Sequence, residues 1–226
     1  MSNIIEVKNV NKFFYKGEER ELHALKNINL TIKHGEYSLL TGPSGCGKTT
    51  LLNAIGALDS VDSGDIYFNN RNITALSEDE RTQIRLDEMG FVFQAYNLVP
   101  VLSVEENIGF IMKLRGSSTS EIKQRVEEVA ALLEIDNKLK SLPNTLSGGQ
   151  QQRVAVARAV AAKPKIILAD EPTANLDSKN SKALMNMMRS LNEKEDISIV
   201  FASHDEYVLK SVNRVIKLSD GAIIED

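Results

Sequence analysis

The sequence predicts an α/β fold: a mainly parallel sheet with helices on its faces, an N-terminal antiparallel β region and an inserted helical lobe. Three observations lead to this prediction. Short alternating runs occupy the first forty residues. Helical stretches dominate from near Ser77, with about 95 to 160 as an inserted lobe, and strands and helices alternate after the lobe. We expect a single domain over residues 1–226, with a core subdomain at about 1–94 and 163–226 and the helical lobe at about 95–162.

The N-terminal β region is predicted from three short runs in which polar and apolar residues alternate. Turns at Lys16-Gly17 and His34-Gly35 separate the runs, which cover residues 4–7, 28–32 and 37–41. The third run leads into a glycine-rich turn, and good helix formers follow at residues 49–58. We therefore expect the order strand, loop, helix at this point of the chain.

The helical lobe is predicted from amphipathic periodicity. Charged residues, Arg125 among them, surround an apolar helical face made of Ile122, Val126, Val129, Ala130 and Leu133. Gly116 to Ser120 is expected to form a loop between two helices of the lobe. Beyond the lobe we expect a helix at residues 178–191 between two buried strands, at 165–169 and 197–202.

Composition and charge narrow the class of protein. The chain has 226 residues, of which 42% are hydrophobic, and a formal net charge of −4 with no basic run, so we expect no nucleic-acid partner. No apolar run approaches the roughly 20 residues that cross a bilayer, and the first residues do not resemble a signal peptide. We therefore expect a cytoplasmic location, and the single cysteine, Cys46, agrees with a reducing compartment.

A phosphate-binding loop is predicted between the strand at 37–41 and the helix that follows it. Its glycines let backbone N–H groups turn toward phosphates, Lys48 is expected to reach the β and γ phosphates, and the Thr49 hydroxyl to ligate Mg²⁺. The residues expected to contact the nucleotide here are Gly42, Pro43, Ser44, Gly45, Cys46, Gly47, Lys48, Thr49 and Thr50. Because Cys46 is part of this loop, we expect thiol alkylation to block ATP binding and bound ATP to protect the thiol.

Two adjacent carboxylates, Asp170 and Glu171, end the apolar run that begins at residue 166. Two charges at the end of a buried strand need a reason, and a nucleotide site supplies one. We expect Asp170 to hold Mg²⁺ through water and Glu171 to polarise the water that attacks the γ-phosphate.

The segment Leu146-Ser147-Gly148-Gly149-Gln150 predicts a second anion-binding helix end. Ser147 is a good N-cap, the two glycines expose the backbone, and the residues through Ala161 suit a helix. A second anion site of this kind could act on a neighbouring molecule's nucleotide. The segment resembles the signature motif of ABC ATPases, and the resemblance extends over nearly the whole chain.

Further residues match the family pattern one by one. Gln94 resembles the Q-loop glutamine, which contacts Mg²⁺ and joins the helical lobe to the core. Asn175-Leu176-Asp177 resembles the D-loop, which crosses the dimer interface, and His204 resembles the switch histidine, which contacts the γ-phosphate. The family stacks an aromatic ring on adenine; we favour Tyr15 and then Phe14, and at least one ring of this cluster is expected to serve packing.

The resemblance implies an ATP-hydrolysing subunit of an ABC transporter at the inner face of the cell membrane. Two copies would form a head-to-tail homodimer when ATP is bound, with each ATP between the phosphate loop of one copy and Ser147, Gly149 and Gln150 of the other. An integral membrane permease would be the partner. The matched segments most resemble subunits paired with macrolide-export or lipoprotein-release permeases, and the chain ends too soon after Gly221 for a regulatory domain.

Several alternatives remain open at this stage. The permease could dock on Tyr96, Leu98, Val99 and Leu102, or these side chains could fill the core of the lobe. A soluble ABC-type ATPase with a non-membrane partner is the second functional candidate. A small-molecule kinase is a third, although it would leave residues 146–150 unexplained, and phosphate release without a phosphorylated acceptor would exclude it.

Overall fold

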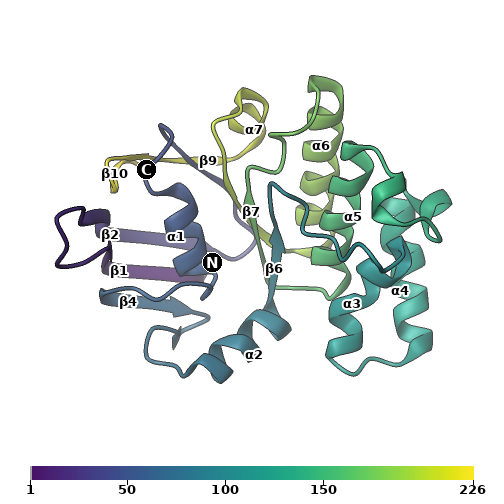
Figure 1. Cartoon of the computed structure of the whole chain (residues 1–226), viewed down its shortest axis with the longest axis horizontal. Helices are drawn as coiled ribbons and strands as arrows, with labels where there is room; N and C mark the ends of the chain where they lie inside the picture. The colour runs from purple at the N-terminus through teal and green to yellow at the C-terminus, as the bar shows by residue number, and fades with distance from the viewer. Residues whose placement is uncertain (1) are drawn as a thin grey trace.

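A six-stranded sheet forms the centre of the molecule in the computed structural model, which describes residues 2–226 (Figure 1). Its strand order is β10-β9-β3-β8-β7-β6; neighbours from β9 to β6 are parallel and β10 is antiparallel. The strands are β3 (Tyr37–Thr41), β6 (Met89–Val92), β7 (Ile166–Asp170), β8 (Ser198–Ala202), β9 (Arg214–Ser219) and β10 (Ala222–Glu225). This confirms the predicted mainly parallel sheet.

A second, antiparallel sheet lies at one end of the molecule, and the helices α3 to α5 lie at the other (Figure 1). Its order is β2-β1-β4-β5. The strands are β1 (Asn3–Phe14), β2 (Leu22–Lys33), β4 (Ser63–Phe68) and β5 (Arg71–Asn72). The antiparallel β region is confirmed, although β1 and β2 are each 12 residues long and therefore longer than their alternating patterns predicted.

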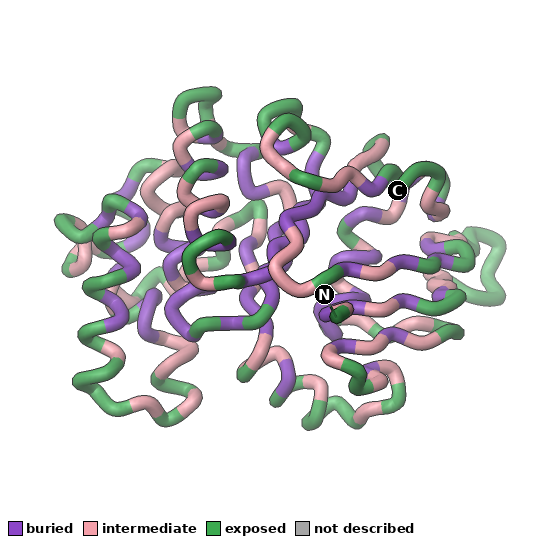
Figure 2. Tube along the Cα trace, turned by 180° about the vertical axis from the view of Figure 1, so that it is seen from behind, coloured by how far each residue is buried: buried purple, intermediate pink, exposed green. Residues whose placement is uncertain are grey.

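The parallel strands are buried on both faces because successive side chains point to opposite sides. Leu39 and Ile199 belong to one apolar cluster with the helical lobe, whereas Leu40 and Val200 belong to another with α1 and the antiparallel sheet. Figure 2 shows buried residues through the centre of the molecule and exposed residues on the outer loops. The helices of the core are α1 (Lys48–Ile55), α2 (Glu78–Glu88), α6 (Ser178–Glu195) and α7 (Glu206–Ser211).

The segment at residues 95–162 contains three α-helices that share the first apolar cluster with the sheet. They are α3 (Val104–Leu114), α4 (Thr119–Leu132) and α5 (Gly148–Ala161), with short 3₁₀ turns η1 (Asp136–Lys138) and η2 (Pro143–Thr145) between α4 and α5. Each α-helix begins with a capping box at Ser103, Ser118 or Ser147, in which the serine and the N3 side chain satisfy each other's backbone N–H. The expected loop lies between α3 and α4.

Arg125 differs from its expected position on the solvated face of α4. Its side chain is 6% exposed, and its guanidinium bonds to Glu195 at 2.6 Å and to Glu128 at 2.9 Å. It also donates to the carbonyls of Val160 and Ala161 at the end of α5. Helical periodicity could not predict this burial, because Glu195 and the two carbonyls come from α6 and α5.

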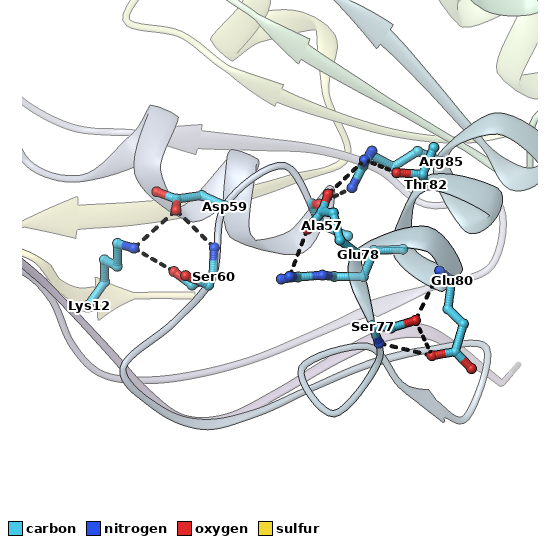
Figure 3. A network of polar contacts seen from close by, with 10 residues as sticks. Lys12, Ala57, Asp59, Ser60, Ser77, Glu78, Glu80, Thr82 and Arg85 are labelled. Atoms are coloured by element: carbon cyan, nitrogen blue, oxygen red, sulfur yellow. Dashed lines mark hydrogen bonds and ion pairs between the residues drawn. The ribbon is translucent and has the colours of Figure 1, made fainter.

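Helix α1 is shorter than the expected helix at residues 49–58. Gly56 caps its end, and Ala57 has a left-handed φ of 54°. In Figure 3, Arg85 of α2 donates to the carbonyl of Ala57 at 2.5 Å, and Lys12 reaches Asp59 at 3.0 Å. These contacts hold the turn after α1 between α2 and β1. Among the described residues, no helix is long and apolar enough to span a bilayer.

Candidate nucleotide site

The phosphate loop follows β3 and leads directly into α1, as the sequence predicted. Its backbone requires glycine at two points. A Cβ on Gly42 would lie 2.1 Å from the carbonyl oxygen of Leu218, and Gly47 has a φ of 104°. Gly47 is the N-cap of α1, and no side chain caps the helix there. Among residues 2–226, no side chain accepts from the first N–H groups of α1, which suits a phosphate at this helix end.

Lys48 places a positive charge within this loop. Its ammonium donates to the carbonyls of Gly42 at 2.9 Å and Pro43 at 3.2 Å, and the residue is 9% exposed. The Lys48 charge opposes the rise that burial causes in the pKa of Asp170, but its hydrogen bonds go to neutral carbonyls, so a phosphate at the loop would give the buried ammonium a direct ionic partner. The loop, the helix end and Lys48 together fit a polyphosphate.

Thr49 and Asp170 meet beside the loop. The Thr49 hydroxyl lies 3.1 Å from each carboxylate oxygen of Asp170, although 121 residues separate them in sequence. Burial raises the pKa of Asp170 above its ordinary value, while the Thr49 hydrogen bond opposes this shift. A hydroxyl and a carboxylate are hard oxygen donors that suit Mg²⁺, which binds through one or two carboxylates and substrate phosphates.

Glu171 lies at the carboxyl end of β7 with an unusual backbone. Its φ is 45°, and its N–H donates to the carbonyl of Ala202 at 2.8 Å. Its carboxylate accepts from the Ser203 hydroxyl at 2.9 Å and lies 2.8 Å from Nδ1 of His204. Parallel pairing of β7 with β8 brings these strand ends together, where α/β sheets commonly bind ligands.

Gln94 lies two residues beyond the end of β6 and is exposed. Its carbonyl accepts from the Asn175 side chain at 3.0 Å, which joins the segment after β6 to the segment after β7. The hydrogen bonds among residues 2–226 include none between the Gln94 side chain and Thr49 or Asp170. A metal-binding role for Gln94 stays a prediction.

The signature segment forms the N-terminus of α5. Ser147 Oγ accepts from Gln150 N at 3.4 Å, and Gln150 Oε1 accepts from Ser147 N at 3.0 Å. A Cβ on Gly148 would lie 3.0 Å from the Tyr96 hydroxyl, and one on Gly149 would lie 3.4 Å from Asn180. The predicted N-cap is therefore present, while the described residues show no hydrogen bond from this segment to the phosphate loop.

Asp177 is the N-cap of α6. Its carboxylate accepts from the backbone N–H of Asn180 at 2.8 Å and from the Asn180 side chain at 2.9 Å. The backbone hydrogen bond from Asn180 is the main cause that lowers the pKa of Asp177. Because Asn180 also lies next to Gly149, the beginnings of α5 and α6 are neighbours. Whether Asp177 crosses an interface stays a prediction.

The aromatic residues at the end of β1 have different surroundings. The ring of Phe13 stacks on His23 with centroids 4.0 Å apart, as expected for packing. Lys12 lies over the ring of Phe14 at 5.4 Å. Tyr15 is 52% exposed, and the guanidinium of Arg20 lies 4.1 Å from its ring centroid. Tyr15 thus has the more accessible ring, which favours it over Phe14 for a stacking contact.

The suggested docking residues are less exposed than expected. Tyr96, Leu98, Val99 and Leu102 are all half-buried, and Leu98 packs against the core of the helical lobe. Val101, which the sequence analysis did not name, is 80% exposed. The observed burial therefore favours the packing alternative for these four side chains.

Sequence reasoning missed residues that support the site. Asn107 of α3 binds the backbone of Val99 through both its amide atoms, and Arg158 of α5 donates to the carbonyl of Tyr96 at 3.0 Å. These residues fix the segment after Gln94, and no motif identifies them. Ser203 also escaped notice as a partner of Glu171, although its position next to His204 was an available signal.

A phosphate loop, an oxygen-donor pair and a glutamate–histidine pair at the carboxyl edge of one parallel sheet define a nucleotide-hydrolysing domain. The family model described as ABC transporter matches residues 25–174, and the chain belongs to that family. It is an ATP-binding and ATP-hydrolysing subunit of an ABC transporter.

Three similar proteins support this assignment. One is the ATP-binding cassette MJ0796 of Methanocaldococcus jannaschii, whose dimeric structure was solved in a post-hydrolysis state with ADP and Pi. It is 44% identical with a TM-score of 0.90, and the match covers 98% of this chain and 97% of that one. The lipoprotein-releasing system ATP-binding protein LolD of Zymomonas mobilis is 38% identical, covering 100% and 97%. The macrolide export ATP-binding/permease protein MacB of Mannheimia succiniciproducens is 42% identical over 99% of this chain but 34% of its own length.

Proposed function

We propose that this chain powers export through a separate integral membrane permease, working as an ATP-closed homodimer at the inner face of the membrane. The proposal depends on ATP hydrolysis, and the observation that supports hydrolysis is the contact of 2.8 Å between Glu171 and His204 beside the Thr49–Asp170 pair. Similarity to MacB, which is named for macrolide export, and to LolD, named for lipoprotein release, supports the export direction.

Each residue at the phosphate loop has a separate binding role. Lys48 and the N–H groups at the start of α1 hold the β and γ phosphates. Thr49 and Asp170 supply oxygen ligands for Mg²⁺, which offsets phosphate charge when it is bound, and Gln94 adds a further ligand. Tyr15 stacks on the adenine. The roles of Lys48, Thr49 and Asp170 rest on their donor chemistry and position, whereas those of Gln94 and Tyr15 rest on the resemblance to the family.

Glu171 and His204 carry the hydrolytic step. Glu171 accepts a proton from the attacking water and orients it in line with the γ-phosphate. His204, which is 76% exposed in the single chain, donates a hydrogen bond to the transferred phosphoryl group. The short Glu171–His204 contact keeps the two side chains on the same side of the site.

A dimer completes the site. Within one chain, Ser147 to Gln150 cap α5 but form no hydrogen bond to the phosphate loop among the described residues. In a head-to-tail pair, the start of α5 from one copy faces the γ-phosphate held by the other, and Asp177 lies beside it at the start of α6. The dimeric relative MJ0796, described with ADP and Pi, supports the formation of a dimer. ATP then closes the dimer, and hydrolysis opens it.

The proposal is tested with a tagged Glu171→Gln variant, which should bind ATP without turnover. The variant is incubated with detergent-solubilised membranes and ATP, and the bound proteins are identified by mass spectrometry. The matched control is Lys48→Ala, which lacks the phosphate-binding ammonium. We expect an integral membrane protein with Glu171→Gln and none with the control. Recovery of ribosomes, DNA-associated proteins or nothing would overturn the membrane proposal in favour of a soluble ATPase.

A further inference from the structure

Both oxygens of the Glu171 carboxylate have a protein partner. Oε1 lies 2.8 Å from Nδ1 of His204, and Oε2 accepts from the Ser203 hydroxyl at 2.9 Å. The terminal torsion of a glutamate side chain is soft, so an unrestrained carboxylate rotates over a broad range. The two contacts together limit that rotation.

The direction of the Ser203 hydroxyl is fixed by its other contact. The backbone N–H of Asp205 donates to Ser203 Oγ at 3.1 Å. A hydroxyl has one hydrogen, and this N–H occupies one of its lone pairs, so the hydrogen is available for Glu171. Ser203 is fully buried, and its own N–H donates to the carbonyl of Leu40 at 3.1 Å. Water therefore cannot easily replace the serine hydroxyl.

A further hydrogen bond joins the segment that contains Glu171 to the segment that contains Ser203. The Thr173 hydroxyl donates to Asp205 Oδ2 at 2.7 Å, and Thr173 is 2% exposed. Thr173 follows Glu171 by two residues, whereas Asp205 follows Ser203 by two. The segments after β7 and β8 are thus joined by the contacts of the Glu171 carboxylate and, two residues further along each segment, by the Thr173–Asp205 hydrogen bond.

We propose that Ser203 is a positioning residue for Glu171, whose carboxylate it holds in the orientation that receives a proton from the attacking water. The inference rests on the proposed role of Glu171 as the base. Ser203 touches neither water nor phosphate in this scheme. It acts by raising the fraction of Glu171 carboxylates that are correctly oriented, so it affects kcat and leaves ATP affinity unchanged.

The experiment measures hydrolysis by the full chain with enzyme in excess over radiolabelled ATP, so that a single turnover is observed. Variants are Ser203→Ala, Ser203→Cys, Glu171→Gln and the double variant Ser203→Ala/Glu171→Gln. The matched control is Ser198→Ala, at the other end of β8; Ser198 is also fully buried, and its Oγ accepts from Gly35 N at 3.0 Å. ATP affinity and thermal unfolding are measured for every variant.

We expect Ser203→Ala to lower the hydrolysis rate about tenfold, as the loss of a hydrogen bond to a charged group predicts, with ATP affinity within about twofold of the original. The hydrolysis rate of Ser203→Cys should lie between that of the original chain and that of Ser203→Ala, because a thiol is a weak hydrogen-bond donor. The Ser203→Ala change should have no further effect in the Glu171→Gln background, and Ser198→Ala should hydrolyse at the original rate.

Two results would overturn the inference while leaving the role of Glu171 intact. One is an unchanged rate in Ser203→Ala when Glu171→Gln is impaired. The other is an equal loss from Ser203→Ala in both backgrounds, which would mean that the serine acts independently of Glu171. Full activity in Glu171→Gln would instead overturn the assigned base, and the inference about Ser203 with it.

Discussion

The Thr49 hydroxyl lies 3.1 Å from both carboxylate oxygens of Asp170, so the start of α1 and the end of β7 meet at one point. Burial at this point raises the pKa of Asp170. A raised pKa means that the ionised form of Asp170 lowers the free energy of unfolding, and a bound divalent cation would offset this destabilisation. The carboxylate that suits Mg²⁺ therefore destabilises the chain when no nucleotide or cation is bound.

Asp170→Asn should stabilise the nucleotide-free chain at neutral pH while removing Mg²⁺-dependent ATP binding. The folded chain retains the Asp170 proton to higher pH than the unfolded chain, so this group lowers stability as pH rises from its ordinary pKa through its raised pKa. Asparagine keeps a hydrogen-bond acceptor without the charge. In urea unfolding, the advantage of the variant should grow as pH rises from the ordinary pKa of Asp170 through its raised pKa and should then stay constant.

Asp177→Asn is the control for this prediction. The pKa of Asp177 is lowered, chiefly by the backbone hydrogen bond from Asn180, so its contribution is present above its ordinary pKa and is lost as pH falls through its lowered pKa. Asparagine also caps helices well, and we expect no stabilisation at neutral pH. An Asp170→Asn variant whose stability difference from the original chain did not grow with pH would contradict the explanation.

The sequence predicted the parts of the fold that depend on local pattern. Gly42 to Thr50 formed the expected strand–loop–helix connection, and Ser147 became the expected N-cap because both motifs act within a few residues. Residues 59–76 were not assigned in advance, although β4 and β5 lie there. Their pairing with β1 is long-range, and short strands have little periodicity of their own.

The missing parts of the site are also long-range. The residues next to Glu171 in the sequence do not indicate that His204 and Ser203 contact its two oxygens. These contacts follow from the pairing of β7 with β8. Arg125 shows the same limitation. Helical periodicity assigned it to the solvated face, whereas carbonyls of α5 and the carboxylate of Glu195 make its burial possible.

Glu195→Ala should lower the free energy of unfolding by roughly 2 kcal/mol, because the buried guanidinium of Arg125 loses one of its two carboxylate partners and keeps Glu128 and two carbonyls. Denaturant unfolding followed by circular dichroism measures this. The control is Lys210→Ala, which removes an ion pair to Glu206 whose side chains are 73% and 81% exposed, and should cost less than about 1 kcal/mol. Similar losses of unfolding free energy in both variants would show that the buried ion pair contributes no more to stability than the exposed one.

Alkylation of Cys46 should be slow and should prevent ATP binding. The residue is 5% exposed, and a Cβ on Gly42 would lie 2.8 Å from its sulfur, so a reagent can reach the thiol only when the loop opens. We expect labelling by a maleimide at least about tenfold slower than in urea, and slower still with Mg²⁺ and ATP. Cys46→Ser, which cannot be labelled, is the control. Labelled chain that still binds ATP would refute the prediction.

Tyr15→Ala should weaken ATP binding about tenfold, because stacking of a base on an aromatic ring contributes roughly 1–3 kcal/mol. The affinity for inorganic triphosphate should not change, since that ligand lacks a base. Phe14→Ala tests the competing assignment: Phe14 is half-buried whereas Tyr15 is exposed, so the loss of the Phe14 ring should matter little. Calorimetric titration with both ligands distinguishes the two. A loss of ATP affinity in Phe14→Ala alone would transfer the stacking role to Phe14.

Two inactive variants should restore activity when mixed, if each site takes residues from two chains. Ser147→Arg places a bulky side chain at the start of α5, whereas Glu171→Gln removes the base from the other half of the site. A mixed head-to-tail dimer then contains one site with both defects and one intact site, formed by Glu171 of the first variant and Ser147 of the second. Random pairing makes half of the dimers mixed, so phosphate release should recover to roughly a quarter of the original rate. The matched control mixes Glu171→Gln with Ser147→Arg/Glu171→Gln, in which no pairing produces an intact site. Equal phosphate release in the two mixtures would mean that the start of α5 does not act on the partner's nucleotide.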